Sequence, residues 1–65
     1  MTDAEKLKHL LKHWIEHNEA HIKNYSEWAS KADSAGNKEL SGILKQVADE
    51  SEKLNGLFNK ALEII

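Results

Sequence analysis

The chain has 65 residues, with nine Lys and Arg, eleven Asp and Glu, four His, no Cys and no Pro. The lack of cysteine excludes disulfides, thiolate metal sites and cysteine nucleophiles, and a formal net charge of -2 argues against nucleic acid as a partner. No apolar run reaches membrane-spanning length and no signal-peptide pattern begins the chain, so we expect a cytoplasmic protein with no membrane contact.

The length and composition favour one small helical domain, which we place at residues 1–65. A chain this short buries a modest core and usually needs a staple or a partner. A sequence rich in Lys, Glu, Leu and Ala and free of proline favours helices. We therefore expect an all-α protein.

The first predicted helix covers about residues 3–34. Thr2 and Glu5 match a capping box at its start, in which the Thr2 hydroxyl accepts a hydrogen bond from the Glu5 amide. At roughly 100° of turn per residue, a run of mostly apolar residues falls on one side of this helix. Its centre is Leu7, Leu11, Trp14, Asn18, Tyr25, Ala29 and Ala32, with Leu10, His21 and Trp28 on one flank and Ile15 and Ile22 on the other.

The turn of the chain is predicted at residues 35–37. Gly36 can adopt the left-handed conformation that ends a helix, and Asn37 can cap the next one. The second helix then covers about residues 38–64. Its predicted core arc is Leu40, Ile43, Val47, Ser51, Leu54, Phe58, Ala61 and Ile65, with Leu44 and Leu62 beside it. So short a turn predicts an antiparallel two-helix hairpin.

Residues equally distant from Gly36 should meet across this hairpin. On that rule Trp14 faces Phe58, and Trp28 faces Leu44. The apolar arcs are wider than one seam, and large exposed apolar patches mark interfaces. We therefore expect a homo-oligomer, most simply a homodimer in which two hairpins form a four-helix bundle.

All four histidines lie on the first helix, four residues apart at positions 9, 13, 17 and 21. This spacing advances each ring roughly 40° around the helix, so that His9 points to solvent and His21 enters the seam. A polar layer is therefore predicted halfway along the hairpin. Its members are His17, Asn18, His21, Glu50, Ser51 and Asn55. Buried polar groups persist only where they satisfy one another, a water or an ion.

Imidazoles four residues apart stand one above the other and can share a metal ion. The best placed pair is His17 and His21, to which His13, Glu50 or a second pair from a two-fold-related chain could add ligands. Imidazole and carboxylate permit nickel, cobalt, zinc or copper. We therefore predict a non-enzymatic metal-binding module for metal handling or sensing, with a metal-handling protein as a further partner.

Two other interpretations use the same residues. A structural or partner-binding oligomerisation module would bind no metal and would use Asn18 only to fix helix register, as single buried asparagines do in coiled coils. A pH-responsive bundle would loosen when His17 and His21 become charged in the seam. On either interpretation His9 and His13 are ordinary surface residues.

The sequence holds only fragments of enzymatic motifs. Residues 13–17 match the His-x-x-Glu-His pattern of one metalloprotease class, but this chain has no room for a third ligand and a substrate cleft. The Glu-x-x-His pattern of di-iron bundles does not occur. No Ser–His–acid arrangement or glycine-rich phosphate loop is visible. We predict that the protein is not an enzyme.

The run His13-Trp14-Ile15-Glu16-His17-Asn18, followed by His21, Tyr25 and Trp28-Ala29, resembles a known group of sequences. It is similar to the first helix of small uncharacterised His-rich helical-hairpin domains of anaerobic microbes. Some of those domains are joined to small β-domains similar to nickel-insertion accessory proteins. The resemblance implies that His13, His17 and His21 are the matching positions and that nickel or a related metal is the partner.

Overall fold

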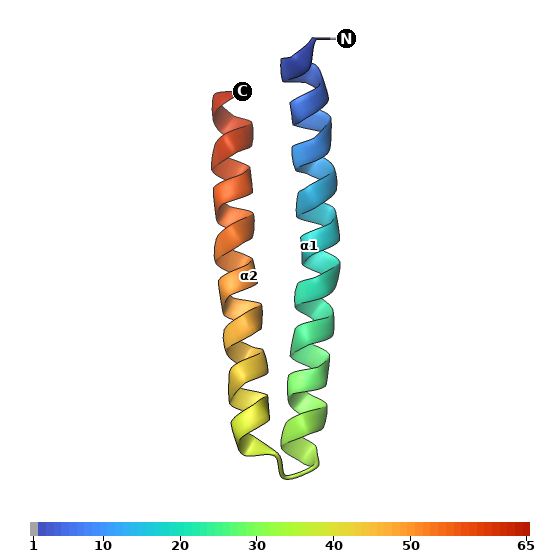
Figure 1. The fold of residues 1–65 in the computed structure, drawn as a ribbon, viewed down its shortest axis with the longest axis vertical. Coiled ribbons are helices and arrows are strands. Elements are labelled where there is room, and N and C mark those ends of the chain that lie inside the picture. Colours follow the sequence, from blue (N-terminus) through green and yellow to red (C-terminus); the bar gives the residue numbers. More distant parts are fainter. Residues whose placement is uncertain (1) are drawn as a thin grey trace.

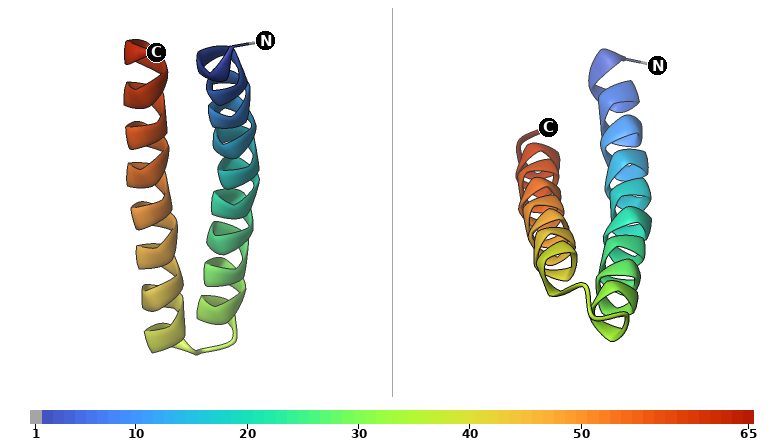
Figure 2. Two further views of the ribbon diagram at one scale, coloured as in Figure 1. Left: turned by 45° about the horizontal axis from the view of Figure 1, so that its top comes forward. Right: turned by 60° about the horizontal axis from the view of Figure 1, so that its bottom comes forward.

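The protein is an antiparallel pair of long helices, seen in a computed structural model that describes residues 2–65 (Figure 1). Helix α1 (Asp3–Ser34) and helix α2 (Lys38–Ile64) lie side by side over nearly their whole length, with the two chain ends at one end of the hairpin and the turn at the other (Figure 2). No strand occurs within the described residues. The predicted all-α hairpin and the bounds of both helices are confirmed, while Met1 of the predicted domain lies outside the described residues.

Three helix ends have the capping chemistry that the sequence predicts. The Thr2 side chain accepts a 3.2 Å hydrogen bond from the Glu5 amide at the start of α1. Gly36, at φ +83°, ends α1 by donating its amide to the Asp33 carbonyl. The amide of Asn37 then bonds back to Ala32, while its side chain caps α2 by accepting from the Leu40 amide. A residue with a Cβ is disfavoured at the φ of Gly36, so the glycine fixes the position of the turn.

Helices α1 and α2 meet along two rows of residues spaced alternately three and four apart, the spacing of an antiparallel helical seam. The row on α1 is Leu11, Ile15, Asn18, Ile22, Tyr25, Ala29 and Ala32, and the row on α2 is Ser41, Leu44, Ala48, Ser51, Asn55, Phe58, Leu62 and Ile65; all are buried or half-buried. The predicted pairing of Trp14 with Phe58 is confirmed, because their ring centroids lie 6.0 Å apart. Near the turn, the Ser41 hydroxyl donates a 2.8 Å hydrogen bond to the Ala29 carbonyl. Small side chains therefore let the helices approach closely there.

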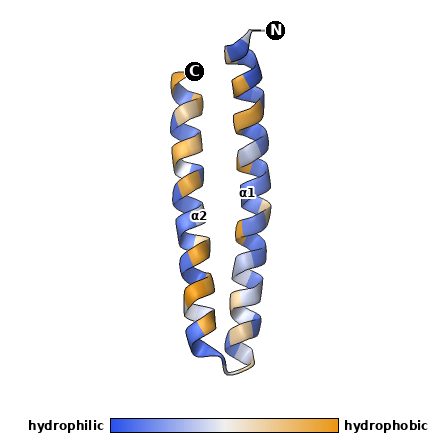
Figure 3. Cartoon of the chain, in the orientation of Figure 1, coloured by the Kyte–Doolittle hydropathy of each residue, from blue (hydrophilic) through white to orange (hydrophobic). Residues whose placement is uncertain are grey.

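The seam of α2 lies one residue later in the sequence than the centre of the predicted arc. Ile43 and Val47, predicted as core, keep 53% and 38% of their surface exposed, and Leu54 is also exposed. On α1, Leu7 and Trp14 likewise remain exposed. The prediction took the whole apolar arc of each helix as core, whereas a single partner helix covers only one edge of that arc. Figure 3 shows apolar residues recurring along both helices over their full length.

The hairpin exposes more surface than a compact protein of its mass. Its accessible surface is 5006 Å², whereas a folded monomer of 7.4 kDa exposes about 4,200 Å². Among residues 2–65 only Leu11, Ala29, Ser41 and Ala48 are buried. The excess of about 800 Å² is surface that a second contact is able to cover.

Within residues 2–65, neither helix combines the length and the apolar character needed to cross a membrane.

Candidate functional site

A row of four rings follows one side of α1. The centroids of His13 and His17 lie 6.1 Å apart with nearly parallel planes. Those of His17 and His21 lie 4.6 Å apart with planes at 88°, and those of His21 and Tyr25 lie 6.0 Å apart. The row places the imidazoles of His17 and His21 closer together than any other ring pair on this helix side. These two rings are therefore the ones best placed to share an ion.

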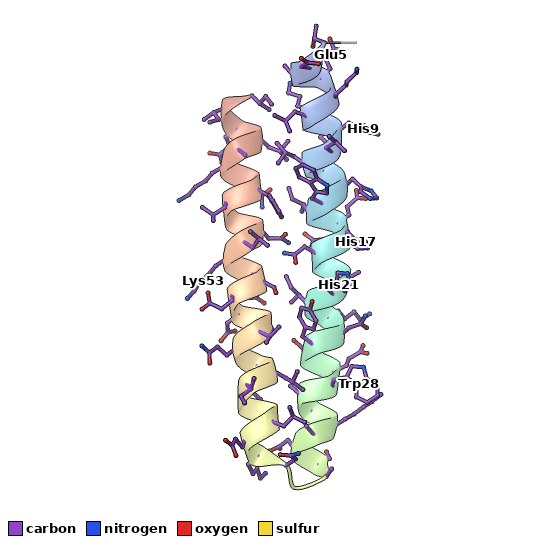
Figure 4. The ribbon with its side chains drawn as sticks, in the orientation of Figure 1. Glu5, His9, His17, His21, Trp28 and Lys53 are labelled. Atoms are coloured by element: carbon purple, nitrogen blue, oxygen red, sulfur yellow. The ribbon has the colours of Figure 1, made fainter. Side chains whose placement is uncertain are left out.

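All four histidines are exposed, and none enters the seam. His17 and His21 each precede a seam residue by one position, which turns their rings about 100° away from α2. Figure 4 shows both labelled rings outside the gap between the helices. The prediction that His21 enters the seam is therefore wrong for the single chain, because the seam takes Asn18 and Ile22 instead.

The polar layer that the structure does contain is smaller than predicted. The Asn18 side-chain amide donates two hydrogen bonds of 2.8 Å, one to the Ser51 carbonyl and one to the Asn55 side-chain oxygen. His17, His21 and Glu50 lie outside this layer on the surface. Asn18 is thus satisfied within the chain, and its hydrogen bonds fix which residues of α2 lie opposite the middle of α1.

The single hairpin does not assemble the predicted metal ligands. Within residues 2–65, no three His, Asp or Glu side chains lie close enough together to hold a metal ion. His17 and His21 are adjacent, while the Glu50 carboxylate accepts a 3.2 Å hydrogen bond from Lys53 in an exposed ion pair. His13 stacks on His17 on the outer side of the row. The four predicted ligand assignments therefore stay predictions. The hairpin brings two of these residues, His17 and His21, next to each other.

An apolar surface runs along the same side of the hairpin as His17 and His21. It is formed mainly by residues that precede the seam residues by one position, together with Leu7; at three further positions of this kind, Asn24 and Lys31 are polar and Ala61 is half-buried. We call this surface the apolar face: Leu7, Leu10, Trp14, His17, His21 and Trp28 on α1, and Leu40, Ile43, Val47, Glu50, Leu54, Leu57 and Ile64 on α2. All of these residues are exposed, including Trp28 at 59%.

The two halves of the apolar face lie on one side of the hairpin because the helices are antiparallel. In each helix, the residue one position before a seam residue is rotated about 100° around the helix axis from the seam. The rotation has the same hand relative to the chain direction in both helices. Because the two helices run in opposite directions and face each other, both rotations lead to the same side of the hairpin. A shallow groove lined by Trp28 of α1 and by Leu40 and Leu44 of α2 confirms that the two helices share this surface near the turn. A second groove follows α2 along Ile43, Val47 and Leu54.

The opposite side of the hairpin is formed by the residues that follow the seam residues by one position, and we call it the polar face. Its members are charged, polar or glycine. They are Lys12, Glu16, Glu19, Lys23, Ser26, Ser30 and Asp33 on α1, and Gly42, Lys45, Asp49, Glu52, Gly56, Asn59 and Glu63 on α2. A Cβ added at Gly42 or Gly56 meets nothing within 4 Å, as expected for an open surface.

Sequence reasoning missed two residues of the seam. Ser41 and Ala48 are among the most buried residues, although neither belongs to the predicted arc. The sequence did contain a signal for them. Small residues at 41, 48 and 51 have the seven- and three-residue spacings of a helical seam, and Ala29 and Ala32 on the other helix have the same three-residue spacing. Hydrophobicity outweighed that signal because Ile43, Val47 and Leu54 form a more apolar row.

Comparisons with known proteins identify a family and a relative of this chain. Residues 7–65 match the model of a family described as "Domain of unknown function (DUF8180)". The protein is also similar to an uncharacterized protein of Archaeoglobus fulgidus, with 36% identity over 61 residues that cover 94% of this chain and 97% of the relative. No solved structure matches the sequence.

Proposed function

The chain belongs to the DUF8180 family, and we propose that this member is a non-enzymatic helical module that pairs with a second copy of itself to form a four-helix bundle. The observation that supports the proposal is the apolar face. It holds ten exposed large hydrophobic residues in two rows with the spacing of a helical seam. Apolar surface of this extent marks an interaction site in a soluble protein.

The size of the apolar face suits a second hairpin. The Cα extents of the molecule are 51 × 15 × 11 Å, so that a second hairpin matches the apolar face in length and width. The excess surface of the single hairpin, about 800 Å², is close to the roughly 800 Å² that each partner contributes to a standard interface. A partner of this length and width is a second copy of the hairpin.

Sedimentation equilibrium tests this proposal directly. At micromolar concentration we expect a species of twice the 7.4 kDa chain mass, with the emission of Trp14 and Trp28 shifted to shorter wavelength as both rings leave water. A helical monomer at the same concentration, with emission typical of exposed tryptophan, would contradict it.

A second candidate function is the binding of a divalent transition metal such as zinc, nickel, cobalt or copper. The observation that favours it is the pair of imidazoles at His17 and His21, whose centroids lie 4.6 Å apart. Titration calorimetry with Zn²⁺ and Ni²⁺ should give a dissociation constant of micromolar or below for the unchanged protein. Metal binding that is only millimolar, and is unchanged when His17 and His21 are both replaced by Ala, would leave the structural module as the function.

A further inference from the structure

The middle of the apolar face is interrupted by titratable groups on both helices. On α1 the interruption is His17 and His21, and on α2 it is Glu50. Contacts across the seam fix which residues share a level: Ala29 with Ser41, Asn18 with Ser51, and Trp14 with Phe58. On that scale His21 is level with Glu50. A hydrophobic interface with such an interruption needs a partner for it, because unpaired buried charges are costly.

Two-fold symmetry allows two ways to pack the apolar faces of two copies. An axis across the helices puts the turns at opposite ends and lays α1 over α1 and α2 over α2. Glu50 then faces the partner's Leu54. This arrangement buries the carboxylate against an aliphatic side chain, which opposes it.

An axis parallel to the helices puts both turns at the same end and lays α1 of each copy over α2 of the other. His21 then faces the partner's Glu50, and Trp28 faces the partner's Ile43. This arrangement sets the Glu50 carboxylate opposite an imidazole instead of an aliphatic side chain, and that complementarity favours it.

We propose that His17 and His21 of one protomer and the partner's Glu50 form a divalent transition-metal site, repeated twice in each dimer. This inference rests on the proposed function, since the single hairpin brings no three such ligands together within residues 2–65. Two imidazole nitrogens and a carboxylate oxygen are a ligand set suited to zinc or nickel, with one position left for water.

The spacing of the observed rings is close to the one that a shared ion requires. Two imidazoles on one tetrahedral ion, each with a metal–nitrogen distance near 2.0 Å, have centroids about 5 Å apart. His17 and His21 lie at 4.6 Å with planes at 88°. The centroids of His13 and His17 lie 6.1 Å apart, which is farther than a shared ion allows. The geometry therefore assigns His17 and His21, and leaves His13 outside the site.

Glu50 is available for this role. Its ion pair with Lys53 at 3.2 Å is exposed, with the side chains 62% and 74% accessible. Exposed pairs of this kind contribute little stability. A metal ion held by two imidazoles therefore competes readily with Lys53 for the carboxylate.

A mixing experiment with two variants tests the shared site. The double-alanine variant carries His17→Ala with His21→Ala, and the glutamine variant carries Glu50→Gln. Each variant dimer by itself should bind Zn²⁺ at least tenfold more weakly than the unchanged protein, which should bind one ion per protomer. After unfolding and refolding together, the mixed dimer regains one intact site, formed by the histidines of the glutamine variant and the Glu50 of the double-alanine variant. His9→Ala, on the exposed outer side of α1, is the matched control and should bind as the unchanged protein does.

Sedimentation of the same samples separates the two proposals. Dimers in which mixing restores no tight binding would overturn the shared site while leaving the bundle intact. Monomers in all samples would overturn both. Tight binding retained by Glu50→Gln dimers would show a site made of histidines alone and would also overturn the assignment of Glu50.

Discussion

The apolar and polar faces of this hairpin are built from the same two helices, yet their compositions are opposite. Residues one position before the seam include both tryptophans and most of the large aliphatic residues, while residues one position after it are charged, polar or glycine. The seam itself contains Ser41, Ser51 and Asn18 and three alanines, so that many of its side chains are small. Ten large hydrophobic side chains of the described residues stay exposed on the face that the hairpin leaves uncovered.

This contrast shows what a pair of helices can and cannot do without a partner. A seam of small and polar side chains fixes the register of the hairpin through specific contacts, such as the hydrogen bonds of Asn18. It buries little apolar area, and area is the main source of folding free energy. We infer that the seam specifies the hairpin and that pairing through the apolar face supplies much of its stability.

A charge placed on the apolar face should have the largest effect. Val47→Glu puts one carboxylate from each protomer into the proposed interface, and we expect the dimer dissociation constant to rise at least about 100-fold because neither charge has a partner. Gly56→Glu is the matched control, since it adds the same side chain to the same helix on the polar face, where the added Cβ meets nothing within 4 Å. Sedimentation equilibrium should show dissociation for the first variant only. Equal behaviour of both variants would mean that the two faces do not differ in function.

Ser41 and Gly42 are adjacent residues near the turn. A larger side chain should lower the free energy of unfolding at Ser41 and raise it at Gly42. Ser41→Val removes the hydrogen bond to Ala29 and adds bulk where only 2% of the side chain is exposed, so that the free energy of unfolding should fall by about 1–3 kcal/mol. Gly42→Ala, on the polar face, should raise it by up to about 1 kcal/mol. Urea unfolding at one fixed protein concentration measures both changes. A tolerated Val at 41 would indicate that the helices are not closely packed there.

The polar layer in the seam should have a moderate effect on stability. Asn18→Ala leaves the Asn55 side chain without its partner, and we expect a loss of about 1–2 kcal/mol in urea unfolding. Replacing both Asn18 and Asn55 by Leu should recover that loss, since neither polar group remains to be satisfied. A double variant less stable than Asn18→Ala would show that the layer contributes more than these hydrogen bonds.

The smallest effect is expected for the exposed ion pair beside the proposed metal site. Lys53→Ala should change the free energy of unfolding by less than about 0.5 kcal/mol, because both side chains of the pair are well solvated. Zn²⁺ affinity should stay equal or rise slightly as Glu50 loses a competitor. A large loss of stability in thermal unfolding would show that the pair has a structural role.

The sequence predicted the elements of the fold but not which side of each helix faces the other. Thr2, Gly36 and Asn37 determine where the helices begin and end, and these signals are local. The choice of seam is not local. Ile43 and Val47 dominate any hydrophobic pattern, whereas the seam depends on how closely Ala29 and Ser41 can approach, which involves both helices at once.

The candidate site was predicted only in part for the same reason. The four-residue spacing predicted the adjacency of His17 and His21, which the ring distance of 4.6 Å confirms. Their position relative to α2 depended on the seam, so that the predicted layer of six residues contained three that lie on the surface. Their place on the apolar face became visible only once the seam was known.

A distance between spin labels tests the pairing of apolar faces most directly. The protein has no cysteine, so that Ser34→Cys provides one labelling position per protomer, beside the turn. Helices in bundles pack 8–10 Å apart, and we predict a single label-to-label distance of about 20–30 Å from two turns at the same end. Absence of any dipolar coupling at concentrations where the protein is folded would contradict pairing altogether, and a distance near the 51 Å length of the hairpin would contradict the parallel axis.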